Sequence, residues 1–80
     1  MIVEFVDMDN HDLLHQIKGE EAKQFLDYAG TINKVHLRIS KDLSFQGAIA
    51  EMIYDLDYIR GTPSQRIEVR LANIQIRRLN

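Results

Sequence analysis

The chain has 80 residues, of which 45% are hydrophobic and 28% are charged, and its formal net charge at pH 7 is −2. A chain of this length supports one hydrophobic core, so we expect a single domain over residues 1–80. The ordinary composition excludes a disordered or fibrous protein, and no apolar stretch approaches the roughly 20 residues of a membrane-spanning helix. The absence of cysteine excludes disulfides and thiolate zinc sites and favours a cytoplasmic setting.

The first element expected is a strand at the amino terminus. Ile2, Val3, Phe5 and Val6 are apolar, and only Glu4 interrupts them. Such a run is typical of a strand that is covered on both faces, so we predict a central position in a sheet.

Two apolar groups follow, and they point in different directions on a single straight helix. The first group is Leu13, Leu14 and Ile17, and the second is centred on Phe25. Gly19 lies where the phase changes. We therefore predict two helical pieces, over residues 10–18 and 20–29, that are kinked or broken at this glycine.

Residues 34–40 alternate between apolar and polar side chains and predict a second strand with one polar face. Residues 45–60 carry apolar side chains at helical spacing, and Gly61 and Pro63 follow as stop signals. They predict a second helix with Phe45, Ala48, Ile49, Met52, Ile53, Leu56 and Ile59 on its buried side.

The carboxyl-terminal segment alternates again, with Ile67, Val69 and Leu71 on one face. The phase then changes, because Ile74 and Ile76 fall on even positions. Residues 72–73 are therefore either a bulge in one long strand or a two-residue hairpin turn, and the bulge is slightly favoured.

These elements predict an α/β fold in the form of a two-layer sandwich. A small mixed sheet of three or four strands, in the order β-α-β-α-β(β), carries helices on one face. The predicted core consists of Phe5, Phe25, Leu37, Ile39, Ile49, Met52, Leu56, Val69 and Leu71.

No pattern in the chain predicts catalysis. The four glycines are isolated, so they form neither a phosphate loop nor a dinucleotide fingerprint. His11 and His15 have the spacing of two metal ligands on a helix, but no third ligand is evident, and a solvated helix face explains them better. We expect no enzyme activity, no metal and no cofactor.

The outer face of the predicted second helix is the favoured binding surface. It would carry a small-residue patch followed by two tyrosines, and tyrosine is enriched at protein interfaces. The hypothesis is a non-catalytic protein-binding module, such as a regulator, inhibitor or adaptor, that contacts its partner through Gly47, Ala50, Glu51, Tyr54 and Tyr58.

A basic sheet face is the alternative, and it suggests nucleic-acid binding. Against it, no aromatic residue falls on that face for base stacking, and the net charge is negative. The residues of this hypothesis are Lys34, His36, Arg38, Arg66 and Arg70.

Self-association is a further expectation. A small sheet has two edges, and the stretch Ile74–Ile76 has its guarding arginines only at positions 77 and 78. The two halves of the chain also carry opposite net charge. We therefore expect a homodimer, formed through the tyrosines or through this strand edge.

Overall fold

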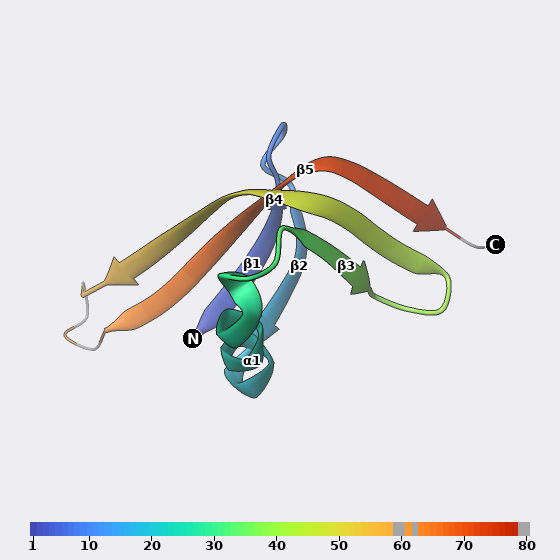
Figure 1. Cartoon of the computed structure of the whole chain (residues 1–80). Coiled ribbons are helices and arrows are strands. Elements are labelled where there is room, and N and C mark those ends of the chain that lie inside the picture. Colours follow the sequence, from blue (N-terminus) through green and yellow to red (C-terminus); the bar gives the residue numbers. More distant parts are fainter. Residues whose placement is uncertain (59–60, 62, 79–80) are drawn as a thin grey trace.

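The computed structural model describes residues 1–58, 61 and 63–78, and these residues form one curved five-stranded sheet with a single helix (Figure 1). The order of the strands is β2-β1-β5-β4-β3; β1 and β5 are parallel, and every other pair is antiparallel. The elements are β1 (Ile2–Asp7), β2 (Leu13–Lys18), α1 (Gly19–Ala29), β3 (Lys34–Arg38), β4 (Leu43–Asp57) and β5 (Ser64–Arg78).

The predicted two-layer α/β sandwich is wrong, because the described chain is mostly β and has one helix instead of several. The helix α1 lies on the concave side of the sheet, against β1 and β2 (Figure 1). It has 11 residues, and no helix in the described part of the chain is long and apolar enough to cross a membrane.

The curvature of the sheet comes from two irregularities in the long β4–β5 hairpin. The pairing register shifts once between Gln46 and Ala48 and once between Ile49 and Glu51. The first shift places an extra residue in β5 beside Asn73, which has a positive φ of 55°, and the second places Ala50 as an extra residue in β4. A bulge bends a strand and increases its twist. The bulge predicted at residues 72–73 is confirmed, and both strands bend near the middle of their length (Figure 1).

Gly47 lies on the concave face at this bend and allows the two strands to approach closely. A Cβ atom at this position would be 3.1 Å from the Cβ of Leu71 and 3.2 Å from the carbonyl oxygen of Ala72. These distances are shorter than ordinary van der Waals contact, so a side chain here would require Leu71 and Ala72 to shift by a few tenths of an ångström.

The core lies between the concave face of the sheet and α1. Phe5 and Phe25 meet edge to face, with their ring centroids 5.2 Å apart, and this contact joins β1 to the helix. Partly buried Leu14, Ile17 and Leu26 pack around it. The buried members of the core are Val3, Phe5, Ala22, Val35, Ile67, Val69 and Leu71.

β1 lies between β2 and β5, as its apolar run predicts, and α1 confirms the second helical piece. The first predicted helical piece is wrong, because residues 13–18 form β2. The backbone amides of Asp9 and Asp12 donate to the side chains of Asp7 and Asn10, and these bonds stabilise a turn that returns the chain antiparallel to β1. The predicted break at Gly19, which has a φ of 59°, is confirmed as the junction of β2 and α1.

The predicted second helix is also wrong: residues 43–57 form β4, and residues 59 and 60 lie outside the described residues. The bulge at Ala50 explains the misleading pattern. Concave-face positions are odd before the bulge and even after it, so Phe45, Ile49, Met52 and Leu56 share one face of a strand. Their spacing of four, three and four residues is the spacing of a helix face.

The predicted core residues therefore divide into three groups. Phe5, Val69 and Leu71 are fully buried. Phe25, Leu37 and Ile49 are partly buried and pack against the core. The prediction is wrong for the third group, which is exposed: Ile39, Met52 and Leu56.

Two leucine variants measure this difference in burial. Leu71→Ala should lower the free energy of unfolding by about 2–5 kcal/mol, because Leu71 is 1% exposed, and the deletion leaves a cavity. Leu56→Ala should cost less than about 1 kcal/mol, because that side chain is 37% exposed. Urea unfolding of both variants checks the pair, and equal costs would contradict the burial described here.

Candidate binding surfaces on the curved sheet

One half of the convex face carries a network of ion pairs. This half consists of β1, the end of β4 and the start of β5. Arg66 pairs with Glu4 and, at 3.3 Å, with Asp55. Arg70 pairs with Glu68 at 2.7 Å and with Glu51 at 3.2 Å. We call this set of residues the ion-pair network.

Both arginines of the ion-pair network donate hydrogen bonds to carboxylates. The hydrogen bond to Glu4 is the largest cause that holds the pKa of Arg66 above its ordinary value, and the bond to Glu68 does the same for Arg70. Four carboxylates share these two guanidinium groups, so the network keeps a residual negative charge.

The other half of the convex face, built from β3, the start of β4 and the end of β5, is basic. Arg38 lies directly beside Ser44 in the β3–β4 pairing, and Ser44 lies directly beside Arg77 in the β4–β5 pairing. The next row across the same three strands contains His36, Gln46 and Gln75.

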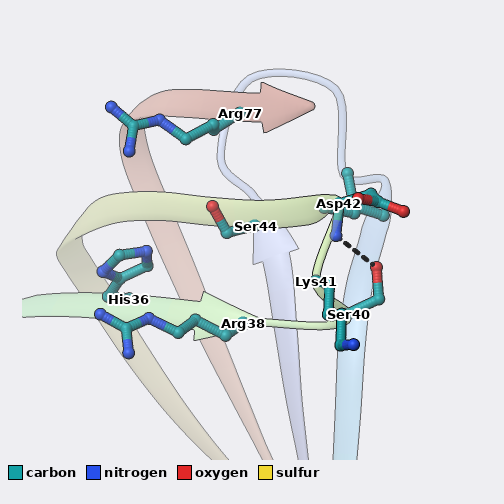
Figure 2. A pocket seen from close by; sticks show the side chains of 8 residues that line it. His36, Arg38, Ser40, Lys41, Asp42, Ser44 and Arg77 are labelled. Atoms are coloured by element: carbon teal, nitrogen blue, oxygen red, sulfur yellow. Dashed lines mark hydrogen bonds between the residues drawn. The ribbon is translucent and has the colours of Figure 1, made fainter. Parts of the chain in front are cut away.

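The first of these rows forms what we call the basic hollow. Its volume is about 180 Å³, and His36, Arg38, Ser44 and Arg77 point toward the same side of the sheet (Figure 2). The turn between β3 and β4 closes one end, where the backbone amide of Asp42 donates to Ser40 Oγ. The full lining is His36, Arg38, Ser40, Lys41, Asp42, Leu43, Ser44 and Arg77.

A second hollow, of about 190 Å³, continues along the same face. It shares His36, Ser44 and Arg77 with the basic hollow and adds the amide side chains of Gln46 and Gln75. The surface thus combines cationic donors at one end with neutral amide groups, which both donate and accept hydrogen bonds, at the other.

The third surface is the free edge of β4. β3 pairs with β4 only at residues 44–48, so among the described residues β5 alone pairs with residues 51–56. Met52, Tyr54 and Leu56 lie on the concave face here, because they are beside Val69, Ile67 and Gln65 of β5. They are 37%, 55% and 37% exposed, and Tyr58 follows at 63%. We call these four residues the apolar row.

A fourth feature lies where the two outer strands of the sheet face one another. An apolar hollow of about 260 Å³ is lined by His15 and Ile17 of β2, by residues 35–39 of β3 and the segment after it, and by Phe5 and Phe25. The sheet therefore curls far enough to bring both edges against one cavity.

The predicted partner-binding residues do not share a surface, because their helix is absent. Gly47 lies where β4 approaches β5 closely, and Ala50 is the extra residue of the bulge in β4. Glu51 is on the convex face in the ion-pair network. Only Tyr54 and Tyr58 remain as large exposed side chains, and they belong to the apolar row.

The predicted basic face is divided in a similar way. Lys34, His36 and Arg38 are on β3, which β4 separates from β5; across β4, His36 is in one row with Gln75 and Arg38 is in one row with Arg77. Arg66 and Arg70 are instead paired with acids in the other half of the sheet.

No pattern in the sequence predicts a binding role for Lys41, Ser44 and Arg77 of the basic hollow, or for Met52 and Leu56 of the apolar row. The alternation along residues 74–78 predicts that Arg77 is on the polar face of its strand. Its neighbours on β3 and β4 follow only from the pairing of the strands.

The two histidines considered as metal ligands are not on a helix. His11 lies in the turn after β1, with a φ of 64°, and His15 is on β2. No group of three potential ligands lies close enough together to hold a metal ion among the residues that the structure describes.

Comparisons of this chain with protein-family models, with curated proteins and with solved structures found no match.

The ion-pair network should make a small, salt-dependent contribution to stability. Arg66→Met should lower the free energy of unfolding by about 1 kcal/mol in low salt, because its two carboxylate partners are partly exposed. Most of this loss should disappear in about 1 M NaCl, where the screening length falls to about 3 Å. Urea unfolding at both salt concentrations checks this, with Arg38→Met as the unpaired control. A loss independent of salt would assign Arg66 a packing role.

Proposed function

We propose that this chain is a non-catalytic protein-binding module that takes up an extended partner segment along the free edge of β4. The observation that carries the proposal is the apolar row beside the outer backbone edge of Glu51–Leu56, which β3 does not cover. Unpaired strand edges bind other chains by adding a strand, in which main-chain hydrogen bonds give affinity and alternate side chains give specificity.

The two faces of this edge define the partner's side chains. On the concave face, the apolar row favours an apolar residue at every second position of the added strand. On the convex face, Glu51 and Asp55 belong to the ion-pair network, which has more carboxylates than guanidinium groups. The added strand should therefore alternate apolar residues with lysine or arginine.

Charge also decides between two modes of self-association. Antiparallel pairing of the β4 edge with its own copy would bring Glu51 and Asp55 of the two chains close together, which is unfavourable. Residues 74–78 instead alternate isoleucine with Gln75 and Arg77, and β1 does not pair with β5 beyond Leu71. A second copy would therefore bind through this segment. The homodimer expected from the sequence remains part of the proposal in that form, as does the cytoplasmic setting.

A peptide with the sequence of residues 70–78 is a direct probe. NMR titration of the full chain should perturb the backbone amides of residues 51–56, and deuterium exchange there should slow, because the added strand forms hydrogen bonds along the outer edge of β4. Met52→Lys with Tyr54→Lys should weaken binding at least about tenfold by placing charge against the apolar side of the peptide.

Two controls isolate the proposed edge. Tyr28→Lys changes a tyrosine of α1 that is similarly exposed and should leave binding unchanged. A peptide with its arginines replaced by glutamate should bind more weakly, because the convex face is acidic. Perturbations that avoid β4, or equal affinity of both peptides, would contradict the proposal.

A further inference from the structure

We infer that the basic hollow is a binding site for a phosphate group, separate from the β4 edge. The arginines of the convex face fall into two kinds. Arg66 and Arg70 each lie directly beside a carboxylate of β4, whereas Arg38 and Arg77 both lie directly beside Ser44. Within the described part of the chain, neither Arg38 nor Arg77 forms an ion pair.

The spacing of the row suits one shared anion. Adjacent strands are about 4.8 Å apart, so the backbones of Arg38 and Arg77 are separated by about 10 Å with Ser44 midway. Two arginine side chains span that gap easily, and both point toward the same side of the sheet (Figure 2). An anion above Ser44 would receive guanidinium N–H bonds from both strands and a hydroxyl bond from the middle strand.

The composition of the hollow favours phosphate over a carboxylate. Arginine presents a planar fork of donors that matches phosphate oxygens, and two forks from opposite sides suit a tetrahedral group with several oxygens. Lys41 adds a third permanent positive charge, and Asp42 is the one acid in the lining. The side chains of Lys41 and Asp42 both lie in the turn, away from the guanidinium groups (Figure 2).

The adjoining hollow indicates how the rest of the ligand would lie. The basic hollow is small for a whole ligand, so the phosphate would enter it while the group that carries the phosphate extends past His36 toward Gln46 and Gln75. Both a small phosphate ester and the backbone of a nucleic acid supply this chemistry, since the amides hydrogen-bond to any polar body.

The test is calorimetric titration of the full chain with sodium pyrophosphate at low ionic strength, and with a single-stranded oligothymidylate in a second arm. We expect pyrophosphate to bind, and Arg38→Gln with Arg77→Gln to weaken it at least about tenfold, because both forks are lost. The matched control is Lys18→Gln with Lys23→Gln, which removes the same charge from exposed positions on β2 and α1. The control should change the affinity less than about twofold.

Each outcome decides the inference. Loss in the arginine variant alone supports the site. Affinity for oligothymidylate that rises with its length, and competition by pyrophosphate, would identify nucleic acid as the source of the phosphate; affinity that does not exceed that of pyrophosphate would identify a small ester. Equal loss in both double variants, or no binding of either probe at about 10 mM, would overturn the inference. Neither result bears on the β4 edge, because the peptide titration is read at residues 51–56 of the full chain, and Arg38 and Arg77 of that chain are not paired with them.

Discussion

The close contact of β4 and β5 at Gly47 is the constraint on which the rest of the structure depends. A Cβ atom there would be 3.1 Å from Leu71 and 3.2 Å from Ala72, so the absence of a side chain allows the two paired strands to approach closely. The bulge beside Asn73 lies opposite Gly47, and the bulge at Ala50 follows three residues later along β4; together they bend both strands. Without the bend, a hairpin of two fifteen-residue strands would be a straighter ribbon, and neither α1 nor the two outer strands could enclose the core around Phe5.

The same bend leaves parts of the sheet incompletely paired. β3 covers β4 only up to Ala48, and β1 covers β5 only from Arg66 to Leu71, so both arms of the hairpin extend beyond their neighbours. One small helix cannot cover strands of this length. The apolar row is thus exposed because the β4–β5 hairpin is longer than the core that it covers. An exposed strand edge of this kind persists in stable proteins when charged residues guard it or when a partner covers it.

The bend also divides the convex face by charge. On one side, carboxylates outnumber the arginines with which they pair. On the other side, arginines lie beside a serine. The net charge of −2 is therefore a poor guide, because it averages two surfaces of opposite sign. Each surface would attract a different ligand, one a basic strand and the other a phosphate.

The sequence by itself determined β1, α1, β3, the break at Gly19 and the bulge beside Asn73, because each follows from local periodicity or backbone freedom. Only the tertiary structure decided β2 and β4. Leu13, Leu14 and Ile17 suit a helix or a strand, and pairing with β1 selects the strand; a bulge at Ala50 resets the alternation of β4 into helical spacing. The tertiary structure also decided the binding surfaces. Arg38, Ser44 and Arg77 are distant in the chain and become neighbours only through strand register, which no local pattern encodes.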